Sequence, residues 1–357
     1  MRQRRGGKVS TIADVAAFAG VSAMTVSRVV NDEPNVRPGT REKVKAAIEA
    51  LHYSPGPPPR RVAPPAAGLT RIGVLYGDPS VGYLNDFLLG LLKKATLRQV
   101  QLLVERCEGP EDEPRLLANM LRGGVDGVIL PPPFCDSPQM LRMLAQAGTP
   151  TVAVSSAQPS EQVCAVGIDD YQAAYEMTRH LLSLGHQRLG FIVGDKHQNC
   201  SARRLAGFRA AMQDACVDIA EDEAVAQGKF SYRSGLDAAE FLLSQVHGRR
   251  PTAIFASNDD MAAATVAIAH RKGIEVPRDL TVVGFDDAPL ATTIWPELTT
   301  VRQPITAMAG AAVDLLVRHI RARQAGDALP CEHKLMGFEL VRRQSDAAPR
   351  PRPIPVA

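Results

Sequence analysis

The sequence predicts a protein of two parts, a small all-α part with a helix-turn-helix and a larger α/β part built on parallel strands. Three observations indicate this division. Residues 11–52 accommodate three short helices separated by turn residues. Residues 54–70 contain six prolines among seventeen residues, which is typical of a linker. From Arg71 onward, short apolar runs alternate with amphipathic stretches.

The three helices of the first part have recognisable start and stop signals. Thr11, with Asp14 three residues later, fits a capping box, and Gly20 is typical of a left-handed helix stop. Ser22 is a favourable N-cap for the second helix, and Thr40 for the third. Apolar residues recur at helical spacing in each segment, and they therefore predict a shared core.

The larger part contains apolar runs of strand length at residues 71–76, 101–105, 127–130, 151–154, 188–193, 253–256 and 281–285. Continuous apolar strands that alternate with helices predict parallel sheets covered on both faces. The pattern leaves open whether these strands form one large sheet or two lobes.

Charge is divided unevenly along the chain. Residues 1–61 hold 11 Lys and Arg against 5 Asp and Glu, whereas the remaining residues hold 30 against 33. A basic head on a slightly acidic body favours binding to a polyanion. No apolar run approaches the about 20 residues that cross a bilayer, and no apolar stretch of signal-peptide length follows the basic start. A cytoplasmic protein with no membrane partner is therefore expected.

The six cysteines are scattered and include no C-x-x-C pair. This spacing argues against a metal site and against a disulfide framework, so reduced and mostly buried thiols are expected.

The first part carries D-V-A, A-G-V-S, T-V-S-R-V-x-N, T-R-E-K-V and L-x-Y-x-P in this order. This series resembles the DNA-binding domain of the lactose/galactose-repressor (LacI/GalR) family of bacterial transcription regulators. The body is similar to that family's effector-binding core in the stretches SLGHQRLGFIVG, RLAGF, PTAIFASNDDMA, LTVVGFDD and PELTTVRQP.

The resemblance implies an N-terminal all-α helix-turn-helix domain joined by a Pro-rich hinge to an α/β two-lobed, periplasmic-binding-protein-like (type I) core. The expected division is a DNA-binding domain at 1–55, a hinge at 56–70, an effector-binding and dimerisation domain at 71–343, and a disordered tail at 344–357.

The second helix is the predicted recognition helix, whose N-terminal turn meets base edges in the major groove. The resemblance places base contacts on Ala23 and Met24, which suit thymine methyls, and on Arg28, which suits guanine O6 and N7. It places contacts to the DNA backbone on Thr11, Ser22, Thr25, Ser27, Asn31, Asn35, Val36, Thr40 and Tyr53. The alternative is that Met24 only packs and Ser22 only caps.

The linker departs from the hinge helix of the family, in which a Leu of each subunit wedges into the minor groove of DNA. Its prolines leave room for one turn, from Pro59 to Ala63, because a Pro inside a helix costs about 3 kcal/mol. Val62 stands at the wedge position, and Arg60 and Arg61 are expected to bind phosphate or the minor groove. We therefore hypothesise a weakened hinge helix.

Ligands of open α/β sheets bind beyond the carboxyl ends of the strands. By resemblance, the effector contacts fall on Tyr83, Asn85, Asp169, Arg204, Phe230, Asn258 and Asp286. Carboxylate, amide and guanidinium groups suit polyol hydroxyls, and an aromatic face suits a sugar ring. The resemblance implies a sugar or glycoside as the effector, because sugars dominate the effectors of the family. Asp and Asn at strand ends also serve as turn formers and helix caps without any ligand.

These features predict a sequence-specific transcriptional regulator whose affinity for double-stranded operator DNA depends on a small effector. A repressor is the favoured type of regulator. A homodimer is expected because two-fold operators need dimers. No leucine heptads follow Arg343, so the tetramer-forming tail of some relatives is not expected. An enzyme is the first alternative, but the chain lacks the Gly-rich phosphate loops and the G-x-S-x-G elbow. A secreted sugar-binding protein is the second, and it would need a signal peptide and would not carry the basic head. No catalytic residue, metal or cofactor is predicted.

Overall fold

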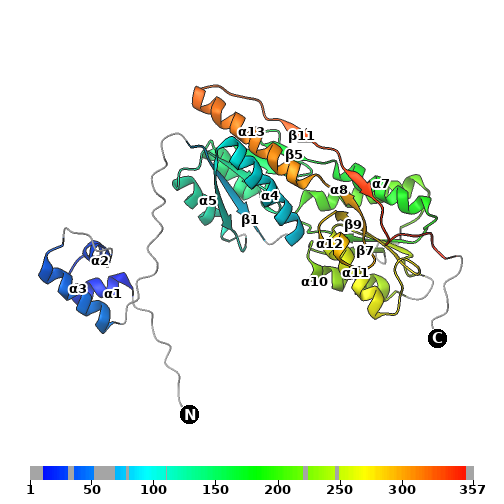
Figure 1. Ribbon diagram of the computed structural model, residues 1–357, viewed down its shortest axis with the longest axis horizontal. Helices are drawn as coiled ribbons and strands as arrows, with labels where there is room; N and C mark the ends of the chain where they lie inside the picture. The colour runs from blue at the N-terminus through cyan, green and yellow to red at the C-terminus, as the bar shows by residue number, and fades with distance from the viewer. Residues whose placement is uncertain are drawn as a thin grey trace, which may run out of the picture. The chain divides into compact units, whose positions relative to one another are not determined.

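The computed structural model describes residues 11–30, 36–51, 69–77, 80–109, 111–219, 224–245 and 249–350. They belong to two compact units, Met1–Ala67 and Gly68–Ala357, which are drawn in Figure 1. Among the described residues, no single helix is long and apolar enough to cross a membrane, and only the bent pair formed by the first two helices meets the criteria of length and composition together.

The first unit is a three-helix domain of α1 (Ile12–Ala19), α2 (Ala23–Val30) and α3 (Pro38–Ala50). The bend between α1 and α2 is 103°. The predicted capping box is confirmed, because Thr11 and Asp14 each accept a hydrogen bond from the other's backbone N–H. The left-handed stop at Gly20 is confirmed by its φ of 64°. Its small core consists of Val15, Ala16, Val26, Val29, Val44 and Ala47.

The start of the third helix differs from the prediction. Ser22 accepts a hydrogen bond from the Thr25 N–H at 3.2 Å, as expected of an N-cap. Thr40 is not the cap of α3, since the helix begins at Pro38 with Arg37 as its N-cap and without a side-chain cap bond. Proline has a fixed φ and lacks an N–H, so the first helical position suits it, and the helix starts three residues upstream of the predicted start.

The second unit is a two-lobed α/β structure, which resolves the choice between one sheet and two. The sheet of the first lobe has the order β11-β5-β4-β3-β1-β2 and is parallel throughout. Its strands are β1 (Arg71–Tyr76), β2 (Gln101–Arg106), β3 (Gly127–Leu130), β4 (Thr151–Val154), β5 (Cys164–Gly167) and β11 (His333–Leu335). Its helices are α4 (Val81–Arg98), α5 (Glu113–Arg122), η1 (Phe134–Asp136), α6 (Pro138–Gln146) and α13 (Ile305–Ala325).

The sheet of the second lobe has the order β12-β10-β9-β8-β6-β7, with β12 alone antiparallel to its neighbour. Its strands are β6 (Leu189–Val193), β7 (Val225–Gln227), β8 (Ala253–Ala256), β9 (Thr281–Asp286), β10 (Thr299–Arg302) and β12 (Glu339–Val341). Its helices are α7 (Asp170–Ser183), α8 (Asn199–Asp214), α10 (Tyr232–Leu243), α11 (Asp259–Arg271) and α12 (Leu290–Thr293).

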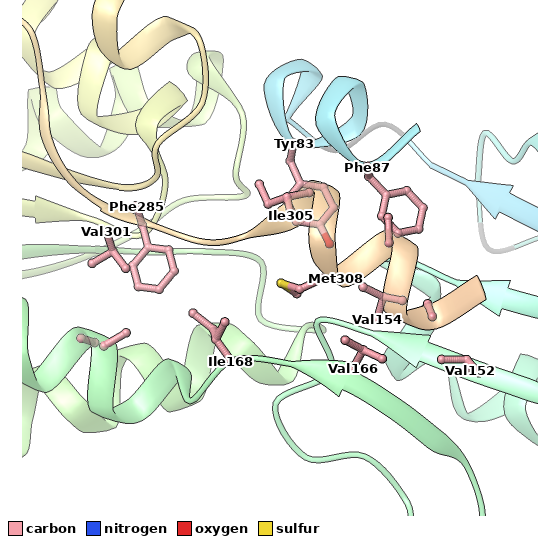
Figure 2. Close-up of a cluster of buried hydrophobic side chains, with 14 of the residues drawn as sticks. Tyr83, Phe87, Val152, Val154, Val166, Ile168, Phe285, Val301, Ile305 and Met308 are labelled. Atoms are coloured by element: carbon pink, nitrogen blue, oxygen red, sulfur yellow. The ribbon is translucent and has the colours of Figure 1, made fainter. Parts of the chain in front are cut away.

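The chain crosses between the lobes after β5, after β10 and after β11, at residues 168–169, 303–304 and 336–338. One hydrophobic cluster runs through these crossings and joins the two lobes. Figure 2 shows Ile168 and Met308 between Phe285 of the second lobe and Val154 of the first. Both lobes therefore share a packed core beside the place where their strand ends face each other.

The expected disordered tail is wrong for residues 344–350. Ser345 is fully buried, its hydroxyl donates to the Val282 carbonyl, and it accepts from the Thr299 N–H. Asp346 Oδ2 lies 2.8 Å from His180 Nε2, within hydrogen-bond distance. Polar residues in this segment satisfy the second lobe's buried polar groups, which composition alone does not reveal. Residues 351–357 lie outside the described part.

Candidate effector pocket and DNA-reading helix

A cavity of about 40 Å³ lies between the two lobes. It is lined by Ser80, Tyr83, Pro132 and Ser155 of the first lobe, by Gln198, Cys200, Arg204, Phe230, Asn258 and Asp286 of the second, and by Gln303 of a crossing segment. One water needs about 10–15 Å³, so this conformation has room for only a few waters. A ligand of sugar size therefore requires the lobes or the lining side chains to move apart.

Arg204 is the most firmly held residue of this cavity. Its Nε donates to Asp170 Oδ1 at 2.8 Å, and its Nη1 donates to the Ser257 carbonyl at 2.5 Å. Its guanidinium carbon lies 3.6 Å from the centroid of the Phe285 ring. Burial raises the pKa of the Asp170 carboxyl, and the charge of Arg204 opposes that shift. The guanidinium is thus a fixed donor that is only 4 % exposed.

Asp286 is the carboxylate that faces this guanidinium, with Oδ1 at 4.0 Å from Arg204 Nη1. It also accepts a hydrogen bond from Gln303 Nε2 at 2.7 Å. Burial raises the pKa of Asp286 to about 7, against the lowering effect of Arg204. The group therefore changes its charge near neutral pH, at the wall of the cavity.

Asn258 combines a structural role with its place in the cavity wall. Its Oδ1 accepts from the Met261 N–H at 3.0 Å as the N-cap of α11, and its Nδ2 donates to the Phe230 carbonyl at 2.9 Å. The Phe230 ring covers Gly194 so closely that a Cβ there would lie 2.0 Å from Cζ of the ring. Asn258 and Gly194 together hold the aromatic face at the cavity.

Tyr83 closes the cavity from the first lobe. Its hydroxyl lies 2.8 Å from the Ser155 hydroxyl, and burial raises the tyrosine pKa far above its usual range.

Ser155, Phe230 and Asp286 have φ values of 61°, 60° and 107°, which non-glycine residues adopt rarely. Such strained backbone is typical of ligand sites, because the surrounding structure must hold it in place.

Five of the seven residues predicted for effector contact line this cavity: Tyr83, Arg204, Phe230, Asn258 and Asp286. The structure places the other two elsewhere. Asn85 is exposed on α4, and Asp169 is the exposed N-cap of α7, which accepts from the Gln172 N–H at 3.0 Å. Two further residues, Asp170 and Gln303, contact Arg204 and Asp286 and were not predicted from the sequence. Both lie at the crossings between the lobes, and the pair Asp169-Asp170 was the one available signal.

The residues predicted to read bases lie on the exposed face of α2. Ala23, Met24 and Arg28 are exposed, and Met24 is 66 % exposed although its side chain is apolar. The exposure of Met24 leaves its side chain available for the predicted base contact.

Several residues predicted to contact the DNA backbone also have structural contacts. The Ser22 and Thr25 hydroxyls lie 2.9 Å apart, and the Thr11 hydroxyl donates to Asp14 Oδ2 at 2.7 Å. Val36 and Thr40 are half-buried. The side chain of Ser27 and the residues Asn31, Asn35, Tyr53, Arg60 and Val62 lie outside the described part of the chain, and so does the hypothesised hinge helix.

Residues 11–56 match the family model of bacterial regulatory proteins of the lacI family, and residues 178–345 match that of a periplasmic binding protein-like domain. Catabolite control protein A of Priestia megaterium is 34% identical over 312 residues, which cover 87% of this chain and 92% of the relative. The chain belongs to the LacI family. As a member of it, the chain is a transcriptional regulator with a helix-turn-helix domain for DNA.

Solved structures of this family have the same architecture. A complex of the transcriptional regulator CelR with cellobiose is 30% identical, with a TM-score of 0.70 over 94% of this chain and 99% of that one. The lac repressor dimer bound to operator and the anti-inducer ONPF is 28% identical, with a TM-score of 0.68 over 96% of this chain and 100% of that one. The predicted fold class, a helix-turn-helix domain with a two-lobed periplasmic-binding-protein-like core, is therefore confirmed.

Proposed function

We propose that this LacI-family chain is a homodimeric repressor whose affinity for operator DNA is changed by a carbohydrate bound between the lobes. The observation that carries the proposal is the set of groups around the cavity: a fixed guanidinium, a facing carboxyl, an amide and an aromatic ring. Hydroxyl groups of a sugar can both donate and accept there, and the Phe230 ring offers a face for stacking. CelR, a relative of similar fold, has been solved with cellobiose.

The small volume of the cavity supports a coupling between ligand and DNA. Since the cavity holds only a few waters, a sugar selects a conformation in which the lobes stand differently. Such a change moves the two DNA-binding domains of a dimer relative to each other. A coupling free energy of about 1–3 kcal/mol would change operator affinity about 5–150-fold.

An exposed apolar surface of the first lobe supports the homodimer. On α4, Val81, Leu89, Leu92 and Leu97 are exposed, and Leu97 is 70 % exposed. Val104 on the neighbouring strand β2 is partly exposed as well. We take these exposed apolar side chains as the candidate dimer surface, and the lac repressor is a dimer in its operator complex.

A thermal-shift screen of the full-length chain against mono- and disaccharides tests the proposal, followed by fluorescence anisotropy with an operator duplex for each hit. A ligand raises the melting temperature by mass action, and the same sugar should change operator affinity. Asp286→Asn should abolish both effects. Asn85→Ala is the matched control, because Asn85 lies near Tyr83 in sequence but outside the cavity. A sugar that binds without changing operator affinity would overturn the proposal, as would stabilisation by a different class of solute alone.

A further inference from the structure

Hydrogen bonds join the two lobes outside the crossing segments, between Asp136 and Asn199. Asp136 ends η1 of the first lobe, and Asn199 begins α8 of the second. The Asn199 N–H donates to Asp136 Oδ2 at 2.8 Å, and Asn199 Nδ2 donates to Oδ1 at 2.9 Å. The Ser156 hydroxyl of the first lobe donates to the same Oδ1 at 2.6 Å. Asp136 is therefore a half-buried carboxylate that its own lobe holds in place and that reaches the other lobe.

The first turn of α8 receives its cap from Asp136. The N-cap residue of α8 is Gln198, whose side chain makes no cap hydrogen bond. The N–H groups of a first helical turn have no partner inside the helix, and a negative charge near them is stabilising. Asp136 supplies both the acceptor and the charge from the opposite lobe. If the lobes part, the start of α8 loses this cap and the carboxylate loses two of its three donors.

The same turn of α8 forms part of the cavity wall. Gln198 and Cys200, the neighbours of Asn199 in sequence, both line the cavity of about 40 Å³. The lobes also touch at a second place, because a Cβ added to Gly82 of α4 would lie 2.7 Å from the Cβ of Ala288 in the second lobe. A ligand that parts the lobes at α8 must therefore break the hydrogen bonds between Asp136 and Asn199.

We propose that Asp136 is a positioning residue that holds the lobes closed over the cavity, so that effector binding requires its release from Asn199. This inference rests on the proposed function, in which the effector binds between the lobes. The apparent affinity for an effector is the intrinsic affinity of the open form multiplied by the fraction of molecules that are open. Hydrogen bonds to a charged acceptor favour the closed form by about tenfold or more. Asp136 thus sets how much effector is needed.

Chemical labelling of Cys200 tests whether Asp136 keeps the lobes closed. Cys200 lines the cavity and is 4 % exposed, whereas Cys164 is buried in the first lobe away from the lining residues and Cys216 is exposed. The ligand-free full-length protein is treated with iodoacetamide, and the labelling of each cysteine is followed by peptide mass spectrometry. In Asp136→Ala, Cys200 should be labelled about tenfold faster, while the rates at Cys164 and Cys216 stay as in the parent.

Three further variants separate opening of the lobes from fraying of α8. Gly82→Ala forces the lobes apart at their other contact, so it should also speed the labelling of Cys200. Asp136→Asn keeps an oxygen that can accept from the Asn199 N–H, and its labelling rate should lie between those of the parent and Asp136→Ala. Glu113→Ala is the matched control, because this buried carboxylate accepts a hydrogen bond at 2.6 Å within the first lobe alone. It should leave the labelling of Cys200 unchanged.

The labelling rates decide the proposal. Unchanged labelling of Cys200 in Asp136→Ala would overturn it. Acceleration in Asp136→Ala that Gly82→Ala does not share would also overturn it, since α8 would then fray alone. Equal acceleration at Cys164 would do the same, since the whole protein would then unfold.

Operator affinity separates this proposal from the proposed function. Without any sugar, Asp136→Ala should change operator affinity about 5-fold or more in fluorescence anisotropy, because its lobes open without a ligand. Faster labelling of Cys200 together with unchanged operator affinity would support the role of Asp136 and contradict the coupling between the lobes and DNA.

Discussion

Arg204 and Asp170 form a buried ion pair, with Nε at 2.8 Å from Oδ1 and both side chains at most 4 % exposed. Asp170 is the first residue of α7, directly after a crossing between the lobes, so the pair ties the cavity wall to that crossing. Replacing Asp170 by Ala leaves Arg204 buried with only the more distant Asp286 as a counter-charge. We expect Asp170→Ala to lower the free energy of unfolding by about 3–5 kcal/mol in urea titrations.

The neighbouring residue provides the control for this prediction. Asp169 is exposed and only caps α7, so Asp169→Ala should cost about 1 kcal/mol, the usual value for a lost N-cap. Equal costs for the two variants would contradict a special role of the Arg204–Asp170 pair.

Asp286 should give the protein a stability that declines as the pH rises from about 4 to 7. Its folded pKa of about 7 lies above its ordinary 3.8, so in this window the folded state holds a proton that the unfolded state has lost. The free energy of unfolding therefore falls with rising pH there, and above pH 7 this group adds no further change. Asp286→Asn replaces the titrating carboxyl group with an amide that does not titrate. The pH profile of urea unfolding should be flatter between pH 4 and 7 in this variant, and superimposable profiles would refute the assignment.

Gly194→Ala tests whether the position of Phe230 defines the cavity. The added Cβ would lie 2.0 Å from Cζ of the Phe230 ring, so the ring must leave its place. We expect loss of the sugar-induced thermal shift and a fall in stability of about 1–3 kcal/mol, as for overpacking. Gly167→Ala is the control, since its added Cβ would approach nothing closer than 3.7 Å. A crystal structure of the Gly194→Ala protein with the ring unmoved would contradict this reasoning.

Met24→Ala should weaken operator binding and leave folding unchanged. The side chain is 66 % exposed at the start of α2, so little packing is lost. Loss of the proposed base contact should cost about 1–3 kcal/mol, or about 5–150-fold in affinity, measured by anisotropy at fixed salt. Phe18→Ala removes a side chain of similar exposure from α1, outside the recognition helix, and should bind as the parent does. A larger loss of operator affinity in Phe18→Ala than in Met24→Ala would contradict the assignment of base reading to α2.

The apolar runs of the sequence predicted seven strands, whereas β5, β7, β10, β11 and β12 were not predicted. Every predicted run became a strand, within one residue at its ends. β11 was missed because its three residues are all exposed, so no burial pattern marks it. β10 was missed because its two threonines are buried although they are polar, so it does not read as an apolar run. Thr300 donates to Asp259 at 2.6 Å, a partner 41 residues away that no local pattern reveals.

The candidate site was predictable where its residues stand in stretches that resemble the family. Arg204 and Asp286 stand in motifs that resemble the family, and Asp286 ends β9. Gln303 and Asp170 belong to the crossings, and a crossing is visible only after the strands have been assigned to two lobes. Asp169 was named by resemblance, and the sequence does not show which of two adjacent carboxylates caps a helix and which points inward.

Ser345→Ala tests whether residues 344–350 are part of the folded second lobe. The fully buried hydroxyl donates to the Val282 carbonyl at 2.5 Å and accepts from the Thr299 N–H at 2.8 Å. Its loss leaves both backbone groups without this partner, so the free energy of unfolding should fall by about 1–3 kcal/mol in urea titrations. Ser183→Ala removes an exposed serine hydroxyl and should change it by less than about 0.5 kcal/mol. A disordered tail from residue 344 would instead make the two variants equally harmless.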